Sequence, residues 1–378
     1  MALRARAVES LGLTKIEPAF WSGRRVLLTG HTGFKGAWAA MWLARMGAQV
    51  TGLALPPETD PNLYTMAEVA RDAASMMVDI RDLEGIAAVV AKANPEIVLH
   101  MAAQPLVRRA ITRPVETFEV NILGTVHLLE SLRSAPSLLA AVVVTTDKVY
   151  ENREDKTWFT EAARLGGHEP YGASKAAAEI ATGAMAKAYF DGDGAAVATA
   201  RGGNVIGGGD FSDDRLIPDI IRAVARGCRP ALRNPSAIRP WQYVLDCLAG
   251  YFCYAQALAA KTTNERSLNF GPAANEVSVA SIASSILEAL AAKPDWDLDP
   301  MQSPHESNTL NVDSTKAREI LGWRDHFPGG QGLAATAAWY LAWRRGEDMR
   351  AVSLEAIDAY MDAQNTAPDC VSIRKRDG

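Results

Sequence analysis

The chain has 378 residues, of which 48% are apolar and 22% charged, and its formal net charge is -5. This length suggests one large domain or two ordinary ones, and the apolar content excludes an intrinsically disordered protein. The acidic balance argues against broad binding of nucleic-acid phosphates. No apolar run approaches the roughly 18 residues of a membrane span, and residues 1–20 mix charged with apolar side chains. We therefore expect a globular cytoplasmic protein that contacts neither membrane nor nucleic acid.

The four cysteines, Cys228, Cys247, Cys253 and Cys370, are scattered and form no CxxC pair. This pattern is typical neither of a zinc site nor of a disulfide framework, so free thiols are expected. No cluster of His, Asp and Glu has the spacing of metal ligands, and we predict no metal site.

From Arg25 onward, short apolar runs alternate with longer helical stretches, which is typical of βαβ units around a parallel sheet. Helices are expected at residues 35–46 and, as a pair interrupted by Pro105 and Pro114, within residues 102–133. Six runs predict strands buried on both faces, because their apolar residues do not alternate with polar ones: residues 26–29, 49–53, 76–78, 97–100, 141–145 and 196–200. We predict an α/β fold, a Rossmann-type doubly wound parallel sheet formed by residues 20–201, with later strands returning to it.

The composition changes after Arg201. Residues 202–240 are rich in Gly and Pro and predict mainly loops. Helical periodicity returns at residues 244–259, 279–292, 314–321 and 332–346. We assign residues 202–345 mainly to a smaller C-terminal substrate-binding lobe, and residues 346–378 to a helix and a tail that frays from about Asn365.

A glycine motif links the first strand to the following helix. In VLLTGHTGFKG, Gly30 permits a tight turn, Gly33 lets backbone N–H groups approach a pyrophosphate, and Gly36 lets helix and strand pack closely. An ordinary strand-to-helix turn is the alternative, but the strand before and the helix after favour a dinucleotide site.

The choice between NAD and NADP depends on the next strands. The second strand ends in Leu53-Ala54-Leu55-Pro56, which offers no acid for a ribose diol. Lys35 or a nearby Arg would favour NADP, so NAD is expected with NADP as the alternative. After the third strand, Asp79 could meet the adenine amino group, or the segment could simply cap a helix through Asp82.

Two short motifs predict a reacting centre. Tyr171 and Lys175 form a YxxxK pair that shares one helix face, and a nearby ammonium lowers the pKa of a phenol. Lys175 could also hold a nicotinamide ribose. The fifth strand runs into Thr146-Asp147-Lys148, at the edge of a parallel sheet where ligands bind.

Five motifs together, GxxGxxG, HMAAQ (100–104), TTDK (145–148), YxxxK and RGGNVIGGGD (201–210), resemble the extended short-chain dehydrogenase/reductases over residues 24–345. TTDK resembles the nucleotide-sugar 4,6-dehydratases among them, and HTGFKG, AAQPLVR, DRLIPD and NPxxxRPWQ are most similar to the members that act on CDP-glucose. The resemblance implies an NAD-dependent hydro-lyase that oxidises C4, eliminates water across C5 and C6, and returns the hydride to C6. Its product would be CDP-4-dehydro-6-deoxy-D-glucose. The implied cofactor-binding residues are Gly30, Thr32, Gly33, Phe34, Lys35, Gly36, Asp79, Ile80, Ala102, Ala103, Gln104, Asn121, Thr145, Tyr171 and Lys175.

The resemblance also implies catalytic roles. Tyr171 would take the proton of the sugar 4-OH, Thr146 would orient that oxygen, and Asp147 would protonate the departing 6-OH. Lys148 stands where many relatives of other nucleotide specificity carry Glu. Because an ammonium cannot accept a proton, Lys148 is either a deprotonated base or an electrostatic stabiliser of the enolate. Its charge would also lower the pKa of Asp147 and oppose protonation of that acid, and a simple surface ion pair between the two residues is the alternative.

The substrate end is expected beyond residue 201. The Gly-rich loop with Asn204 would bind a diphosphate, and the Arg239 guanidinium matches two phosphate oxygens. Structural turns and a surface salt bridge are the respective alternatives. The predicted substrate-binding set is Gln104, Asn204, Arg215, Leu216, Pro218, Arg233, Asn234, Arg239 and Glu306, whereas His31 and His100 are expected to be structural.

Other functions stay open at this point. A dehydratase of a UDP-, dTDP- or GDP-linked hexose would keep the same motifs. A nucleotide-sugar 4-epimerase would not need the pair Asp147 and Lys148, and a non-catalytic dinucleotide-binding regulator would not need Tyr171. The resemblance also implies a homodimer or a higher homo-oligomer, for which the helices of residues 102–133 and 172–189 have suitable apolar faces.

Overall fold

The computed structural model describes residues 15–153, 157–192, 194–273, 277–299 and 310–366. Within these ranges, seven parallel strands form one sheet in the order β12-β7-β5-β4-β1-β2-β3. The strands are β1 (Arg25–Thr29), β2 (Gln49–Ala54), β3 (Ala73–Met77), β4 (Ile97–His100), β5 (Ala140–Thr146), β7 (Ala196–Gly202) and β12 (Ser267–Phe270). The Rossmann-type sheet is confirmed, and the third strand begins three residues earlier than predicted.

Residues of the central strands are buried on both sides of the sheet, which explains their continuous apolar runs. Every residue of β4, β5 and β7 is buried. In β1, Val26 and Leu28 pack into one hydrophobic cluster and Leu27 into another on the opposite face. The chain order reverses between β1 and β4, which creates the crevice where such sheets bind ligands.

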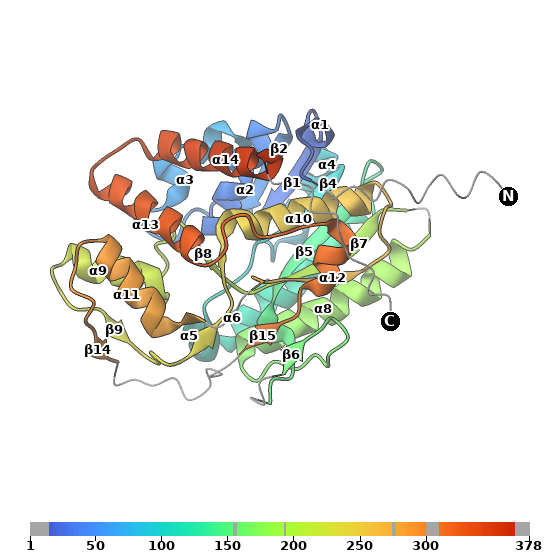
Figure 1. Cartoon of the computed structure of the whole chain (residues 1–378). Helices are drawn as coiled ribbons and strands as arrows, with labels where there is room; N and C mark the ends of the chain where they lie inside the picture. The colour runs from blue at the N-terminus through green and yellow to red at the C-terminus, as the bar shows by residue number, and fades with distance from the viewer. Residues whose placement is uncertain (1–14, 154–156, 193, 274–276, 300–309, 367–378) are drawn as a thin grey trace, which may run out of the picture.

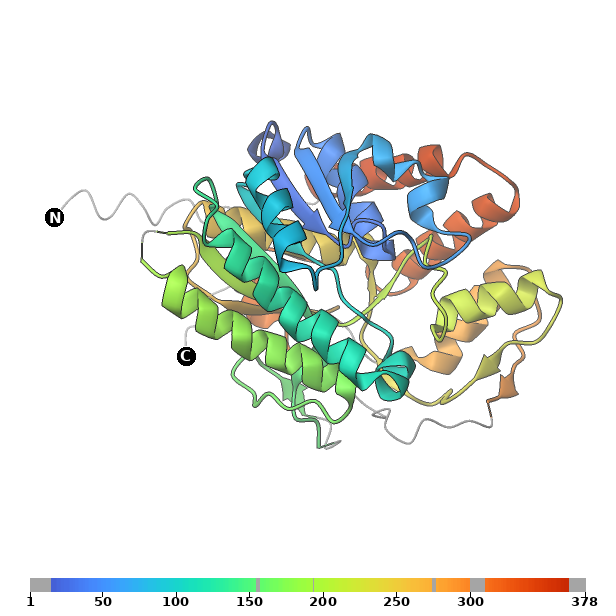
Figure 2. The same ribbon diagram turned by 180° about the vertical axis from the view of Figure 1, so that it is seen from behind.

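Helices cover both faces of the sheet (Figures 1 and 2). Helices α2 (Phe34–Arg45), α10 (Val244–Ala259) and α14 (Met349–Thr366) lie on one face, and α4 (Leu83–Ala93), α7 (Gly124–Leu132) and α8 (Pro170–Tyr189) on the other. Helix α10 has the predicted bounds, and nearly all of its residues are buried. The C-terminal helix is docked through Tyr360, whose ring lies 5.2 Å from that of Trp42 in α2. The tail predicted beyond α14 lies outside the described residues.

The helical pair predicted within residues 102–133 is present. Helix α5 (Val107–Thr112) is followed by one continuous helical segment, α6 (Pro114–Phe118), the π-helical turn η2 (Glu119–Leu123) and α7. Pro114 separates the pair because it occupies the first position of α6, where its missing N–H breaks no hydrogen bond. The π turn matters for the site because it carries Asn121.

A smaller lobe stands beside the carboxyl ends of the strands (Figure 1). It is built from α9 (Leu216–Ala225), α11 (Val279–Ala289), α13 (Gly330–Arg344) and the two-stranded sheet of β9 (Ala231–Leu232) and β14 (Asp297–Leu298). Helix α11 packs against both α9 and α13. The chain crosses back to the main sheet at β12, so the lobe is interleaved with the Rossmann part.

Loops dominate residues 202–240 as predicted, but helix α9 within this range was not predicted. Ile217, Ile220 and Ile221 have helical spacing and are buried. Pro218 does not break this helix because it lies in the first turn, where N–H groups have no partner inside the helix. The helix was not predicted because the sequence around it is rich in Gly and Pro, which favours loops.

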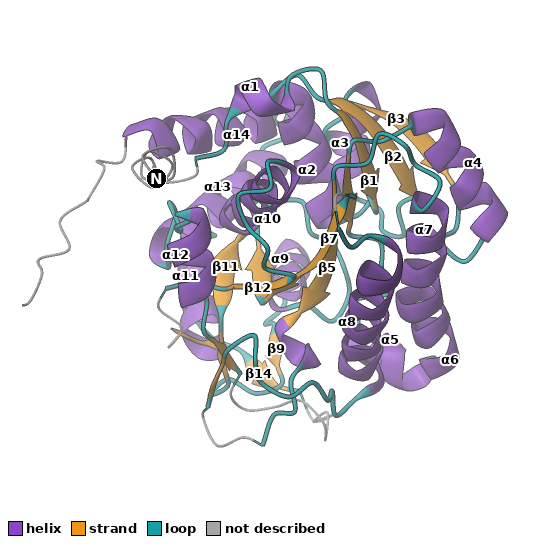
Figure 3. Cartoon of the chain, turned by 90° about the vertical axis from the view of Figure 1, so that its right-hand side faces the viewer, coloured by secondary structure: helices purple, strands orange, loops and turns teal. Residues whose placement is uncertain are grey.

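Short elements complete the chain: α1 (Pro18–Trp21), α3 (Leu63–Met66), η1 (Val69–Arg71), η3 (Asp147–Val149), β6 (Trp158–Phe159), β8 (Asn204–Ile206), β10 (Ile238–Arg239), β11 (Trp241–Tyr243), β13 (Val277–Ser278), β15 (Asn311–Val312) and α12 (Thr315–Leu321). Figure 3 shows how the helices enclose the strands. Among the described residues, no helix combines the length and the apolar character needed to cross a bilayer.

Candidate active site

A cavity of about 270 Å³ lies between the carboxyl ends of β5 and β7 and the lobe. Its wall on the sheet side includes Lys35, Thr146, Lys148 and Tyr171. Its other walls come from the loop and strand that follow β7 and from the first turn of α9. Predicted catalytic and substrate residues from distant parts of the chain are therefore brought together around one cavity.

Asp147 is a buried acid at the end of β5. It is 1% exposed, and the Thr146 hydroxyl donates to its Oδ1 at 3.0 Å. Its Oδ2 has no hydrogen-bond partner within the described ranges. Burial raises the pKa of Asp147 and outweighs Lys148, Thr146 and Arg239, which act to lower it. The alternative of a surface ion pair is wrong because Asp147 is buried, and the direction of its pKa shift suits a general acid.

Tyr171 and Lys175 lie at the start of α8. Glu169 caps the helix by accepting the backbone N–H groups of Tyr171 at 2.6 Å and Gly172 at 2.8 Å. Lys175, one turn later, is 4% exposed and donates from Nζ to the Val144 carbonyl at 3.0 Å. The carboxyl end of β5 and the start of α8 are thus held together directly.

The pKa values of this pair correct one expectation. Burial lowers the pKa of Lys175 to about 7, and the charge of Lys35 acts in the same direction. Burial raises the pKa of Tyr171 to about 12, although a hydrogen bond with Thr146 acts to lower it. The predicted lowering of the Tyr171 pKa by Lys175 is not seen, because desolvation is the larger effect.

Asn121 connects the loop after β4 to α8. Its Nδ2 donates to the Gln104 carbonyl at 3.1 Å and to Ser174 Oγ at 2.8 Å, and its Oδ1 accepts the Gln104 N–H at 2.9 Å. The π turn places this buried amide next to Ser174, the residue that precedes Lys175 in α8. The side chain of Gln104 bonds Thr117 and the backbone of Leu106, and it does not line the cavity.

A buried ion pair lies beneath these groups, and the sequence did not reveal it. Glu179, one turn after Lys175, binds Arg201 of β7 at 2.8 Å, with side chains only 3% and 6% exposed. Glu179 also accepts hydrogen bonds from Thr145 at 2.5 Å and Thr199 at 2.8 Å. The pair therefore joins α8 to β5 and β7.

The predicted glycine motif forms a cradle for an anionic group. Gly30 has φ +79°, and a Cβ on it would lie 2.8 Å from the Ala102 nitrogen. A Cβ on Gly36 would lie 2.0 Å from the Gly30 carbonyl oxygen. Helix α2 begins beside Gly33 without a side-chain cap, so its first N–H groups stay available to a diphosphate. This arrangement fits a dinucleotide.

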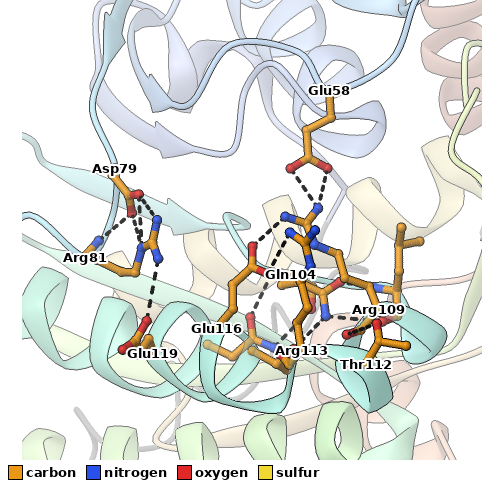
Figure 4. A network of polar contacts seen from close by, with 12 residues as sticks. Glu58, Asp79, Arg81, Gln104, Arg109, Thr112, Arg113, Glu116 and Glu119 are labelled. Carbon is orange, nitrogen blue, oxygen red and sulfur yellow. Dashed lines mark hydrogen bonds and ion pairs between the residues drawn. The ribbon is translucent and has the colours of Figure 1, made fainter.

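Two arginines near the ends of β2 and β3 are held by carboxylates (Figure 4). Arg109 binds Glu58 at 3.0 Å and Glu116 at 2.5 Å, and Arg81 binds Asp79 at 2.5 Å. A 2′-phosphate would have to displace these carboxylates, which supports NAD over NADP. Asp82 caps α4 by accepting the Gly85 N–H at 3.0 Å, as the alternative predicted. An adenine contact by Asp79 stays a prediction.

Lys35 faces the reacting end of the site. Its Nζ lies 5.7 Å from the ring centroid of Tyr251, and its side chain lines the same cavity as Thr146 and Tyr171. Burial lowers its pKa. The suggestion that Lys35 favours NADP is therefore wrong, because the side chain points away from the end of β2.

The remaining cofactor-site predictions lie around the cradle. Thr32 Oγ1 donates to the Leu55 carbonyl at 2.8 Å, and Phe34 starts α2. Ile80 is buried against Gly124, while Ala102 follows β4. Ala103, the next residue, lies in the same loop.

The histidines are structural, as expected. His100 bonds Thr29 at 2.7 Å and Thr125 at 3.0 Å, and burial lowers its pKa to about 3. His31 bonds Ser75 at 2.9 Å, and burial lowers its pKa to about 4. Both imidazoles therefore serve as neutral packing groups.

The predicted substrate residues of the lobe line the cavity. Arg239 is 5% exposed, which excludes the alternative of a surface salt bridge. Arg215 binds Asp210 at 3.1 Å. The other lining residues are Asn204, Leu216, Pro218, Arg233 and Asn234, while the predicted Glu306 lies outside the described residues.

Several lining residues were not predicted as site residues, and Asp219 and Arg108 are among them. Arg108 of α5 binds Asp214 at 3.0 Å and Asp299 at 3.2 Å, and so links the Rossmann part to the lobe across the cavity. Its position within AAQPLVR was the only signal in the sequence.

Comparisons with known proteins identify the family of this chain. Residues 27–336 match the family described as GDP-mannose 4,6 dehydratase. The chain is 41% identical to the CDP-glucose 4,6-dehydratase of Salmonella typhimurium, covering 92% of this chain and 99% of the relative. It is 28% identical to a dTDP-glucose 4,6-dehydratase of Xanthomonas campestris, covering 88% and 98%.

Solved structures share the fold. A UDP-glucose-4-epimerase from Stenotrophomonas maltophila with bound NAD superposes with a TM-score of 0.75 at 22% identity, covering 85% of this chain and 99% of that one. MoeE5 in complex with UDP-glucuronic acid and NAD superposes with a TM-score of 0.71 at 25% identity, with the same coverage.

Proposed function

The chain belongs to the GDP-mannose 4,6-dehydratase family, and from this premise we propose that it converts CDP-D-glucose into CDP-4-dehydro-6-deoxy-D-glucose. The relative at 41% identity is a CDP-glucose 4,6-dehydratase and aligns over almost its whole length. This similarity supports CDP as the nucleotide of the substrate. The observation that carries the reaction is the buried Asp147, an acid whose pKa burial raises. It lies directly behind the cavity wall, next to Gly203 and within electrostatic range of Tyr171. A 4-epimerase has no use for such an acid.

The cofactor is NAD. Gly30, Gly33 and the first turn of α2 would hold its diphosphate, and the carboxylates on Arg81 and Arg109 disfavour a 2′-phosphate. When bound, it supplies a hydride acceptor at C4 and a hydride donor at C6 of the sugar.

The residues at the end of β5 and the start of α8 would handle the protons of the first step. Tyr171 Oη would take the proton of the sugar 4-OH as a phenolate, a form that the positive charge of bound NAD would favour against the burial that raises its pKa. Thr146 would orient the sugar oxygen. Lys175 Nζ, with a pKa of about 7, can take up and release a proton near neutral pH. Asn121 holds the neighbouring Ser174 and thereby fixes Lys175.

The elimination would then use Asp147 and Lys148. Asp147 protonates the departing 6-OH, and its unpartnered Oδ2 lies 3.3 Å from where a Cβ on Gly203 would stand at the cavity wall. Lys148 lines the cavity and is placed either to take the C5 proton or to stabilise the enolate as an ammonium. Both roles need Lys148 beside C5.

Mass spectrometry of products tests this function. The protein with NAD is incubated separately with CDP-, UDP-, dTDP- and GDP-linked glucose or mannose. Loss of one water from CDP-glucose is the expected result. If only another nucleotide sugar loses water, the assignment of CDP as the nucleotide is wrong. A product of unchanged mass would favour an epimerase.

We also propose that the protein pairs with itself through α6, η2 and α8. Val115, Phe118, Leu123 and Ile180 on these elements are 67%, 38%, 48% and 64% exposed, and α6 packs beside α8. Exposed apolar side chains on adjacent helices favour burial against a second copy.

The variant Ile180→Asp should shift the sedimentation coefficient of the protein to that of a monomer. Leu298→Asp, at an equally exposed leucine of β14 in the lobe, should leave the assembly intact. Unchanged assembly in Ile180→Asp would contradict an interface at α8.

A further inference from the structure

One orientation of a nucleotide sugar matches the cavity well. The reacting sugar carbons must lie beside Thr146 and Tyr171, and a diphosphate is best matched by the buried guanidinium of Arg239. The base then falls among α9, β9 and α11. We call this part of the wall the base end; its lining residues are Leu216, Pro218, Asp219, Leu232, Arg233, Asn234 and Val279.

The base end combines apolar surfaces with a few polar groups. Leu216, Leu232 and Val279 come from three different elements and suit the two faces of a flat ring. Asp219 is the only carboxylate among the base-end residues, and Arg233 is the only cation among them. The ring edge would therefore meet one acceptor and one donor.

Asp219 is held in place by its neighbours. Arg222, one turn later in α9, binds Oδ1 of Asp219 and also donates to the carbonyls of Phe211 at 2.8 Å and Ser212 at 3.1 Å. Within the described ranges, Oδ2 of Asp219 accepts no hydrogen bond. Burial raises the pKa of Asp219, whereas Arg222 and Arg233 act to lower it, so Arg233 lies within electrostatic range of the carboxylate.

We propose that Asp219, held by Arg222, selects cytosine by accepting a hydrogen bond from its C4 amino group. This inference rests on the proposed function. Cytosine offers a donor at C4 and an acceptor at N3, whereas uracil and thymine offer an acceptor at C4 and a donor at N3. The Asp219 carboxylate matches the C4 amino group of cytosine, and Arg233 matches its N3 acceptor. In uracil and thymine, the carboxylate would face the C4 carbonyl and the guanidinium would face the N3 donor. Specificity then comes from repulsion of the wrong base as well as attraction of the right one.

The first test compares kcat/KM for CDP-glucose, UDP-glucose and dTDP-glucose in the wild type and in Asp219→Asn. The amide of Asn can turn its N–H₂ group toward a C4 carbonyl, so the preference for CDP over UDP should fall about 10- to 100-fold. An unchanged preference in Asp219→Asn would overturn the proposal while the proposed function stands.

Asp213→Asn is the matched control. Asp213 also pairs with Arg222, at 3.4 Å, but its side chain is 85% exposed and does not line the cavity. The preference for CDP should be unchanged in Asp213→Asn. An equal fall in both variants would assign the effect to Arg222 and overturn the role of Asp219.

A second measurement uses the unmodified protein and so does not depend on folding of a variant. CDP, UDP and the diphosphate of pyrimidin-2-one riboside, which lacks any group at C4, are compared as competitive inhibitors. The pyrimidinone should bind about tenfold or more weakly than CDP but more tightly than UDP. Equal binding of pyrimidinone and CDP would overturn the proposal. A wild type that dehydrates only another nucleotide sugar would overturn the proposed function itself.

Discussion

The two ends of the active-site cavity hold their polar groups by different means. Thr146, Asp147 and Lys175 are 6%, 1% and 4% exposed and lie on or directly beside regular elements. At the base end, the side chains of Asp219 and Arg233 are 38% and 23% exposed and are held by ion pairs and loop carbonyls. The reacting groups are thus fixed by packing, and their burial shifts their pKa values. The base-recognition groups are fixed by ion pairs, which solvent screening weakens.

The largest effect is expected at the packed end. Tyr171→Phe removes the group that accepts the proton of the 4-OH, and loss of a general base costs about 100- to 10,000-fold in rate. Single-turnover absorbance at 340 nm measures the first hydride transfer directly. Tyr189→Phe, at the exposed far end of the same helix, is the control. A normal first step in Tyr171→Phe would assign the proton to another group.

Asp147→Asn should block elimination while leaving C4 oxidation in place, again with a loss of about 100- to 10,000-fold. Because the acid must be protonated and burial raises its pKa, the elimination rate of the wild type should fall as pH rises through that raised pKa. The amide does not titrate, so this alkaline decline should be absent from the residual activity of the variant. Quenched-flow mass analysis across a pH series measures the step. A rate that increases with pH over the same range would argue that Asp147 acts as a base.

The smallest effect is expected from charge pairs across the cavity. Arg108→Met breaks the pairs with Asp214 and Asp299, whose side chains are 34% and 20% exposed. Partly exposed pairs contribute about 0–1 kcal/mol each, so KM for the nucleotide sugar should rise less than about tenfold with kcat nearly constant. Arg113→Met, at an exposed pair with Glu116, should change neither constant. A loss of kcat as large as that of Tyr171→Phe would show that Arg108 belongs to the reacting centre.

The same contrast explains what could be predicted from the sequence. Tyr171 and Lys175 are four residues apart on one helix, and Thr146, Asp147 and Lys148 are contiguous at a strand end, so their proximity follows from local geometry. The strands of the central sheet could be predicted for a similar reason, since burial on both faces leaves continuous apolar runs.

Other features depend on packing between distant segments. The Lys35 side chain lies near the ring of Tyr251, which is more than 200 residues away in the sequence. The pair of Glu179 and Arg201 joins a helix to a strand, and neither residue type in isolation predicts a buried partner. Asp219 stands in the DRLIPD motif, but its role was not predicted because its carboxylate is oriented by Arg222 on α9, a helix that the Gly- and Pro-rich sequence did not predict.

The position of β12 in the sheet has a consequence for synthesis on the ribosome. Residues 267–270 supply the strand that pairs with β7, and α10, which packs on the same sheet, ends at Ala259. Until these residues leave the exit tunnel, β7 has an unpaired edge, and strand edges of this kind are open to pairing with other chains. About two thirds of the chain must therefore stay unaggregated during synthesis before the sheet can be completed, and this is the interval in which protection by chaperones would matter most.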